Sequence, residues 1–427
     1  MRVLHLVHQY LPEHIGGTEL YTRWLTEALS QRGHEISIFY RRSAEGKGLE
    51  SRTDSAPLGY GGQQVWPAWS GILDPKRRFL ATFGDQALME AFEQVLVKTR
   101  PELVHLQHLM GLPVALVWYL QERGIPFIIT LHDYWWVCAN AQLFTNYSQK
   151  ICDGPQAYLN CARCALARVN YPHLWPAIPG LAGLLARRNQ LLWQVMQAAH
   201  KLIAPSQFVA NWYAAHGVPV EKLRTIFHGL LQPVLLPRPE KRPDRPIRFA
   251  YIGGLSSQKG VHVLVEAFNG LAQGTELWIA GDETADPGYV ARLRQNASPG
   301  IRFLGRLTRE QVWETLTQID IVVVPSLWYE TFSFIISEAF AAKAPVIASK
   351  LGPLTERVHH EGDGLLVPPG DVAALRQALC RFLQEPALLP RLQAGIQPVQ
   401  TMEAHAGEIE AVYEAVIAET FNKRDRA

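Results

Sequence analysis

Two glutamates eight positions apart, Glu330 and Glu338, are the residues of this sequence with the most readily interpreted chemistry. They lie in VVVPSLWYETFSFIISEAF (322–340), where an apolar run ends at Pro-Ser, an aromatic loop follows, and helical spacing then begins. This pattern predicts Glu330 in a loop at the carboxyl edge of a strand and Glu338 about two turns into the next helix. Ligands of open α/β sheets bind at this edge. Two carboxylates there favour a polyhydroxylated or cationic ligand, since buried unpaired carboxylates are costly; the alternative is two solvated surface acids.

A second candidate site is the segment YIGGLSSQKG (251–260). Gly253 and Gly254 form a turn after a predicted strand, and Lys259 comes just before a helix that starts near Val261. Helix amino termini favour anions, and a lysine beside one suits a diphosphate. The segment has neither the G-K-[ST] ending of a P-loop nor the G-x-G-x-x-G pattern. The alternative is a tight turn with a solvated lysine.

The first half of the chain offers two weaker signals. Gly16 and Gly17 precede a predicted helix, and glycines there let a backbone approach a ligand without a Cβ in the way. His132 and Asp133 end the stretch PFIITLHD, at the strand edge where ligands gather. A plain loop and a structural histidine are the respective alternatives.

Four of the five cysteines cluster, at Cys138, Cys152, Cys161 and Cys164. Four thiolates could bind a structural zinc ion tetrahedrally, and the C-x-x-C spacing of the last two suits such a site. The alternative is a loop with ordinary reduced thiols, because a cytosolic chain with five cysteines does not favour disulfides. Cys380 lies in an apolar helical pattern and is expected in a core.

These residues need a scaffold of parallel strands, and strand and helix patterns alternate in both halves of the chain. The alternation predicts parallel β-α-β units, and 427 residues favour two domains. We therefore expect an α/β protein with two doubly wound domains. Predicted strands are 3–7, 35–40, 103–107 and 126–133 in the first half, and 247–254, 276–281, 301–305, 320–326 and 345–349 in the second.

The domain boundaries follow from changes in composition. An N-terminal domain is expected over 1–230, a Pro-rich charged linker over 231–246, and a C-terminal domain over 247–400. The helical stretch in 401–427 lies beyond the second core pattern and is expected to pack back on the first domain. Residues 134–190 break the alternation with cysteines, aromatic residues and prolines, and are interpreted as an insertion.

Residues 65–80 and the insertion both combine tryptophan with basic side chains. Together they favour an interfacial membrane surface or a wall that binds an acceptor. Hydrophobic lids packed on the first domain are the alternative.

Composition narrows the classes of function. The net charge is only +2. This argues against nucleic acid as the main partner, because nucleic-acid binding calls for a concentrated basic face. Val3–Val7 is interpreted as a buried strand rather than a signal peptide, and no window reaches the roughly 18 apolar residues of a membrane span. The expected location is cytoplasmic, with peripheral contact at the inner face of the membrane.

Taken together, these motifs resemble the retaining glycosyltransferases of family 4, the glycogen synthase and mannosyltransferase-like group 1 enzymes. That resemblance implies the GT-B architecture, two Rossmann-like domains facing across a cleft. It covers nearly the whole chain, and its most specific part is E-x7-E in the context P-S-x-x-x-E-x-F. Other matching segments are G-G-x-E at 16–19, TLHD (130–133), the glycine turn with Lys259, GPLTERV (352–358) and GDGLLVPPGD (362–371).

The resemblance also assigns roles. Glu330 contacts the hydroxyls of the transferred sugar, and Glu338 binds the ribose hydroxyls. Lys259 neutralises the leaving diphosphate, and His132 lies beside the reacting face of the sugar. Further donor contacts are implied for the backbone of Gly16 and Gly17 in the opposite domain, for Gly253 and Gly254, for the amides of Phe332, Ser333 and Phe334, and, beside the base, for Arg306 and Leu307.

By the same resemblance, the reaction moves a hexosyl unit from a nucleotide diphosphate sugar, with UDP or GDP favoured, to a saccharide or lipid-linked acceptor. It implies cell-surface polysaccharide or glycolipid synthesis and no cofactor for catalysis. Two positions depart from the family: Gly254 replaces the usual arginine, and Thr331 replaces a common glycine. The alternatives are a catalytically weak sugar-nucleotide-binding or scaffold protein and a GT-B-fold sugar epimerase.

Overall fold

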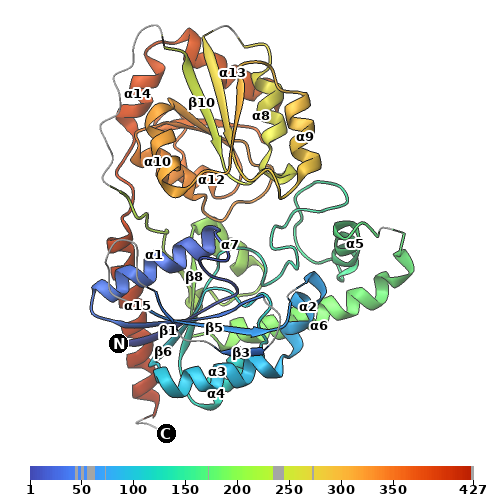
Figure 1. Cartoon of the computed structure of the whole chain (residues 1–427), viewed down its shortest axis with the longest axis vertical. Helices are drawn as coiled ribbons and strands as arrows, with labels where there is room; N and C mark the ends of the chain where they lie inside the picture. Colours follow the sequence, from blue (N-terminus) through green and yellow to red (C-terminus); the bar gives the residue numbers. More distant parts are fainter. Residues whose placement is uncertain are drawn as a thin grey trace. The chain divides into compact units, whose positions relative to one another are not determined.

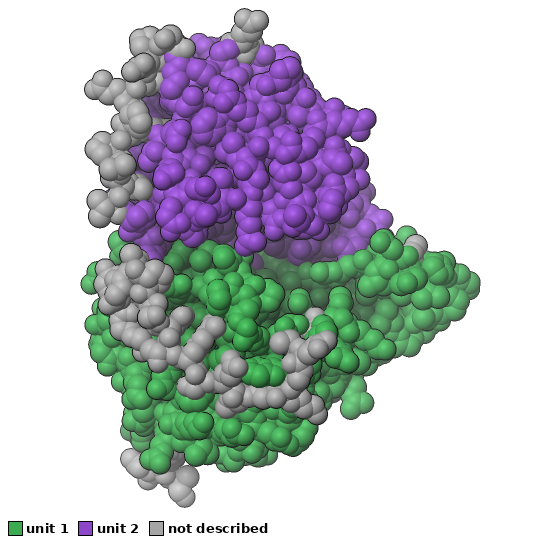
Figure 2. Space-filling view, in the orientation of Figure 1, with its two compact units in different colours: residues 1–141, 154–229, 400–427 green, residues 142–153, 230–399 purple. Residues whose placement is uncertain are grey.

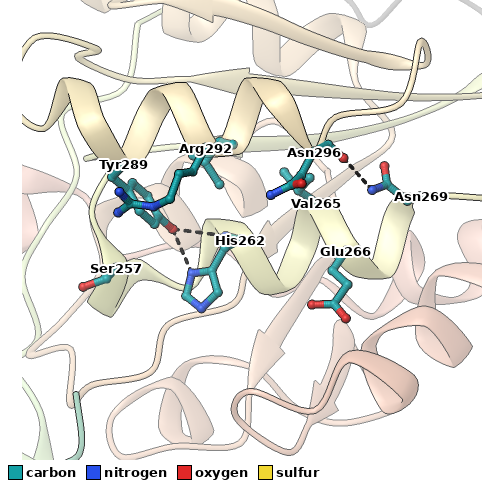
Figure 3. Close-up of a pocket in the computed structure, with 9 residues that line it drawn as sticks. Ser257, His262, Val265, Glu266, Asn269, Tyr289, Arg292 and Asn296 are labelled. Atoms are coloured by element: carbon teal, nitrogen blue, oxygen red, sulfur yellow. Dashed lines mark hydrogen bonds between the residues drawn. The ribbon is translucent and has the colours of Figure 1, made fainter. Parts of the chain in front are cut away.

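The structure is a computed structural model that describes residues 1–43, 47–49, 52–54, 63–72, 74–171, 173–233, 245–271 and 274–424. The chain divides into two compact units (Figure 2). Unit 1 comprises Met1–Ala141, Gly154–Gly229 and Gln400–Ala427. Unit 2 comprises Gln142–Asp153 and Leu230–Val399.

Unit 1 is built on a sheet with the strand order β3-β5-β2-β1-β6-β7-β8-β9, and β4 also pairs with β5. All pairs are parallel except those of β3 and β4 with β5. The strand order reverses at β1, which lies between β2 and β6. The strands are β1 (Arg2–Val7), β2 (Glu35–Arg41), β3 (Lys47–Leu49), β4 (Arg52–Asp54), β5 (Gln63–Ser70), β6 (Leu103–Leu106), β7 (Phe127–Thr130), β8 (Lys201–Ala204) and β9 (Leu223–Thr225).

Helices cover both faces of this sheet, with α1 on one face and α3 and α4 on the other (Figure 1). The α-helices are α1 (Gly17–Gln31), α2 (Pro75–Leu80), α3 (Gln86–Thr99), α4 (Ala115–Glu122), α5 (Leu159–Arg168), α6 (Ile178–Ala198), α7 (Gln207–Ala215) and α15 (Met402–Arg424). Short 3₁₀ helices are η1 (Ala81–Phe83), η2 (Trp175–Ala177) and η3 (Val220–Lys222).

Unit 2 is a second, wholly parallel sheet with the order β12-β11-β10-β13-β14-β15. The order reverses at β10, which lies between β11 and β13, as in the doubly wound dinucleotide-binding fold. Its strands are β10 (Ile247–Ile252), β11 (Thr275–Ala280), β12 (Ile301–Gly305), β13 (Ile321–Val324), β14 (Val346–Ser349) and β15 (Gly364–Val367). The central strands β13 and β14 are buried along their whole length, which explains their continuous apolar sequences.

The helices of unit 2 form two layers, in which α8 packs on α13 and α9, and α10 packs on α11. Local sequence defines their starts: Asp286 caps α9, and Thr308 with Gln311 forms a capping box on α10. They are η4 (Ser257–Lys259), α8 (Val261–Phe268), α9 (Pro287–Gln295), α10 (Arg309–Gln318), α11 (Phe334–Ala341), α12 (Leu354–Arg357), α13 (Val372–Gln384) and α14 (Leu388–Gly395).

The segment expected to return to the first domain is α15, which packs against α1 in unit 1. Two hydrogen bonds join α15 to unit 1: one between His405 Nε2 and the Tyr21 hydroxyl at 2.9 Å, and one between the Tyr413 hydroxyl and His105 Nδ1 at 2.7 Å. Three boundaries differ from the sequence-based interpretation: Gln142–Asp153, within the expected insertion, and Leu230 belong to unit 2, and Gln400 belongs to unit 1. Of the expected linker, residues 234–244 lie outside the described residues.

No helix in the described part of the chain combines the length and the apolar composition that crossing a membrane requires.

Candidate functional site

In unit 2, Glu330 is the centre of a polar cluster in the loop after β13. Its Oε1 atom accepts hydrogen bonds from Lys259 Nζ at 2.7 Å, Ser326 Oγ at 2.7 Å and Trp328 Nε1 at 3.1 Å. The residue is only 6% exposed. A buried carboxylate is stable when it is ion-paired and hydrogen-bonded in this way. The sequence-predicted Lys259 and Glu330 therefore lie in direct contact, although the resemblance gave them separate ligand groups.

The position of Lys259 depends on how the loop after β10 meets the loop after β13. Gly260 ends η4 with φ +71°, and a Cβ there would lie 1.9 Å from the carbonyl oxygen of Pro325. Only glycine permits both the left-handed conformation and this close approach. The Leu327 amide also donates to the Gln258 carbonyl at 2.8 Å. These contacts hold Lys259 beside Glu330 where the strand order of the sheet reverses.

Glu338, in the second turn of α11, is 3% exposed and pairs with Arg309, whose Nη2 lies 2.6 Å from its Oε1. Arg309 is the first residue of α10 and was missed by the sequence analysis. Two features of the sequence could have indicated it. A buried glutamate needs a cation as its partner, and Arg309 follows the strand whose end was expected to border the base. Arg306 in that loop instead pairs with Asp282, at 3.6 Å. Leu307, the next residue after Arg306 in the sequence, is half-buried.

The amino terminus of α11 presents the segment expected to hold the sugar and phosphates. Ser333 occupies the N-cap position of the helix with φ +68°, an unusual conformation for a non-glycine residue. Phe332 is 3% exposed, with the Arg357 guanidinium 4.1 Å from its ring centroid. Burial lowers the pKa of Arg357 to about 10. The side chain of Phe332 thus anchors the loop, and the start of α11 carries the partial positive charge of a helix amino terminus.

The glycine turn after β10 differs in its two residues. The Gly253 amide donates to the Ala280 carbonyl at 3.0 Å, which places it in the sheet edge. The Gly254 carbonyl accepts a hydrogen bond from the Tyr251 hydroxyl at 2.6 Å. A Cβ added at Gly254 would meet no atom within 4 Å. The family's arginine could therefore be placed here without a clash at Cβ.

In unit 1, Gly16 and Gly17 begin α1, as the sequence predicts. A Cβ on Gly16 would lie 2.5 Å from Glu19 Oε2, so glycine leaves room for that carboxylate. Glu19 is 2% exposed, and burial raises its pKa. Its Oε1 lies 3.6 Å from His8 Nε2, the residue that directly follows β1. The glycine pair thus borders a buried acid–histidine pair.

His132 follows β7 and is held by Gln107, with 2.8 Å between His132 Nε2 and Gln107 Oε1. The amide nitrogen of Gln107 lies 3.1 Å from His5 Nδ1. Since an imidazole nitrogen must donate to the amide oxygen, Gln107 selects the tautomer of His132 with a proton on Nε2. Burial lowers the pKa of His132 to about 3, with His108 as a second cause. His132 is therefore a neutral imidazole.

A second histidine pair lies at the same edge of the sheet and was missed by the sequence analysis. The rings of His8 and His108 are 4.4 Å apart, and His108 Nε2 lies 3.2 Å from Asp133 Oδ2. The signal was present: His8, His108 and His132 each come one or two residues after a buried parallel strand. The carboxyl ends of parallel strands share one edge, so these side chains had to converge. The imidazoles at this edge can donate hydrogen bonds to hydroxyl groups and accept hydrogen bonds from them.

The cysteines do not fall in one unit: Cys138, Cys161 and Cys164 belong to unit 1, and Cys152 to unit 2. Asn140 Nδ2 lies 2.9 Å from Cys164 Sγ. Among the described residues, no three His, Cys, Asp or Glu side chains are grouped so that they could hold a metal ion. Zinc at these cysteines stays a prediction that metal analysis of the purified protein can test.

Comparisons with known proteins identify the family of this chain. The model described as "Glycosyltransferase Family 4" matches residues 15–230, and "Glycosyl transferases group 1" matches residues 246–385. The chain belongs to glycosyltransferase family 4. Its two α/β units therefore have the GT-B fold, and the motifs at Gly16-Gly17 and at Glu330 and Glu338 lie within the matched segments.

Individual relatives are more distant. Glycogen synthase of Mycobacterium tuberculosis is 32% identical over 172 residues, which are 39% of this chain and 41% of that protein. The chain thus spans about two fifths of that relative's length. Sucrose-phosphate synthase of Thermosynechococcus elongatus is 21% identical with a TM-score of 0.71, covering 98% of this chain and 99% of that one. Anabaena Alr3699/HepE, solved in complex with UDP, is 16% identical with a TM-score of 0.63, covering 99% of this chain and 100% of that one.

Proposed function

We propose that this chain is a retaining glycosyltransferase that moves a hexosyl unit from a nucleoside diphosphate sugar to a saccharide or lipid-linked acceptor. The observation that carries the proposal is the cluster of Lys259 with Glu330 where the sheet of unit 2 reverses, beside the start of α11. A cation and a helix amino terminus suit a diphosphate, and a carboxylate suits sugar hydroxyls. UDP or GDP is the proposed nucleotide, and the UDP complex of Alr3699/HepE supports the former.

The proposed roles in unit 2 follow the charges of the reaction. When the bond between the anomeric carbon and the phosphate oxygen breaks, positive charge develops on the sugar ring and negative charge on the diphosphate. Lys259 and the α11 terminus stabilise the diphosphate, and Glu330 holds the sugar hydroxyls. Glu338, fixed by Arg309, accepts hydrogen bonds from the ribose hydroxyls. These roles invoke no metal ion.

In unit 1, the neutral His132 is proposed to hydrogen-bond the sugar near its reacting carbon. Retention follows if the acceptor hydroxyl attacks from the side of the leaving group. The departing phosphate oxygen then takes the acceptor proton, so that no side chain needs to act as the base. The proposed setting is cell-surface polysaccharide or glycolipid synthesis at the cytoplasmic face of a membrane.

The test is release of free nucleoside diphosphate from UDP-, GDP- and ADP-sugars by the purified chain with saccharide acceptors and lipid extracts. Glu338→Ala is expected to weaken donor binding, whereas Glu314→Ala, an exposed glutamate on α10, is the matched control. Nuclear magnetic resonance of the product gives the anomeric configuration. Donor binding without release would instead identify a sugar-nucleotide-binding scaffold protein. Absence of both would refute the proposal.

A further inference from the structure

The part of the insertion that belongs to unit 1 forms a lobe with a small hydrophobic core of its own. Ala162 of α5 packs with Ala182 and Leu185 of α6, and Phe79 of α2 joins them. We call α2, α5, α6 and the loop between the last two the α5–α6 lobe. Figures 1 and 2 show α5 and α6 as a projection of unit 1 that extends away from its sheet. Several large apolar side chains of the lobe lie outside this core and are exposed.

The loop between α5 and α6 exposes apolar side chains from a folded backbone. Trp175 is 70% exposed, Tyr171 52%, Val169 49% and Leu174 45%. The Tyr171 amide donates to the Leu166 carbonyl at 2.9 Å, and the Leu174 amide donates to the Tyr171 carbonyl at 3.1 Å. Four exposed apolar residues within seven positions of sequence are unlike the scattered single ones of an ordinary surface.

The rest of the lobe continues this pattern. Of the thirteen large hydrophobic residues that are exposed in the described part of the chain, eight lie on or directly beside its elements. They are Ile72, Leu80, Leu159, Val169, Tyr171, Leu174, Trp175 and Leu184.

Charge on the lobe has one sign. No aspartate or glutamate occurs from Gly154 to Val220, a run that includes all of α5 and α6. Exposed basic side chains are Lys76, Arg77, Arg163, Arg168 and Arg187. The acid at the start of α2, Asp74, caps that helix and lies 3.9 Å from Arg77. An exposed apolar tip flanked by cations matches an anionic interface rather than an apolar protein groove.

We propose that the α5–α6 lobe docks on an anionic lipid bilayer. Tyr171, Leu174 and Trp175 enter the interfacial region, where aromatic rings with a polar edge are favoured. The arginines of α5 and α6 lie against the lipid phosphates, and their aliphatic stems cover apolar surface. This inference specifies the partner at the membrane and does not rest on transferase activity, since binding to lipid is measured without a donor.

The experiment is co-sedimentation of the full chain with phosphatidylcholine vesicles that contain about one third phosphatidylglycerol, at low and high ionic strength. We expect binding that weakens as salt rises, and little binding to pure phosphatidylcholine. The triple variant Tyr171→Ser, Leu174→Ser, Trp175→Ser should bind at least about tenfold more weakly. Arg163→Gln, Arg168→Gln, Arg187→Gln should also bind more weakly and lose most of the salt dependence.

The control is Val97→Ser with Val220→Ser, at residues 70% and 71% exposed elsewhere in unit 1. It should bind as the parent chain does. Equal loss in the control, no loss in the triple variant, or equal binding to neutral vesicles would overturn the proposal. So would self-association that the triple variant abolishes while vesicle binding is unchanged. If the triple variant melts early, Trp175→Ser alone decides, because its exposed ring contributes little to the fold.

Discussion

The two units end their parallel strands in chemically different ways. In unit 2 the buried acids are ion-paired, Glu330 with Lys259 and Glu338 with Arg309. In unit 1 the same edge carries buried imidazoles, and His132 is uncharged. The carboxylates at the edge of unit 2 are thus paired with lysine and arginine, whereas Glu19 and Asp133 at the edge of unit 1 face the imidazoles of His8 and His108. This difference fits the proposed division between a half that holds an anionic donor and a half that orients hydroxyl groups.

The largest expected difference between the units is their response to acid. Burial lowers the pKa of His5, His132 and His405 in unit 1, to about 3, 3 and 4. Their unfolded-state pKa is 6.5, so below that pH the unfolded chain binds protons that the folded one refuses. Stability present above pH 6.5 is therefore lost as pH falls toward 4. A difference of three bound protons changes the free energy of unfolding by about 4 kcal/mol per pH unit. Glu19 has a raised pKa and binds a proton in the folded state, which offsets at most one of these three.

The described part of unit 2 has no comparable group of buried histidines with lowered pKa values. His262 there has a lowered pKa, but its side chain is exposed. Calorimetry from pH 7.5 to 5 should therefore show the transition of unit 1 falling first. His405→Gln should reduce the pH dependence by about one proton, whereas His173→Gln, at an exposed position, should not. A transition of unit 2 that falls first would contradict the comparison.

Removing the cation of unit 2 should have the next largest effect. Lys259→Ala is expected to lower turnover by about 10²-fold or more, because the leaving diphosphate loses its countercharge. Lys259→Arg should retain part of the rate. Steady-state kinetics measure the change, with exposed Lys350→Ala as the control. Unchanged turnover in Lys259→Ala would remove this residue from the site.

The two glutamates should separate catalysis from binding. Glu330→Gln is expected to lower turnover more than nucleotide affinity, because it alters contacts to the reacting sugar. Glu338→Gln is expected to weaken nucleoside diphosphate binding about tenfold while turnover of bound donor changes less. Calorimetric titration and single-turnover kinetics distinguish these effects. The reverse result would mean that the two roles are exchanged.

The smallest expected effect tests the missing arginine. Gly254→Arg adds a cation at an exposed position where a Cβ has open space. Diphosphate affinity should rise by at most about fivefold, the range of exposed ion pairs. Gly254→Gln is the neutral control for side-chain size. If Gly254→Arg weakens binding, another group already fills this role, and the paired Arg306 and Arg309 are the residues to substitute next.

The sequence was sufficient for the α/β class, for the fold family, and for each strand that carries a site residue. Apolar runs mark β1, β7, β10 and β13 because parallel strands are buried on both faces. Short edge strands such as β3 and β4 have no such signal. Partners of buried charges, above all Arg309, were missed because they are set by packing between elements remote in sequence. The cluster of His8, His108 and His132 was missed because no one of these histidines, taken alone, indicates a site.

The return of α15 to unit 1 has a consequence for the order in which this protein is made. The hydrogen bonds between Tyr21 and His405 and between His105 and Tyr413 join early residues of unit 1 to a helix that is synthesised after unit 2. Most of unit 2 is a continuous run of chain that is complete before α15 leaves the ribosome. Unit 2 can therefore finish folding before α15 is available to unit 1. Until then Tyr21 and His105 of unit 1 lack the side chains that they contact in the folded protein.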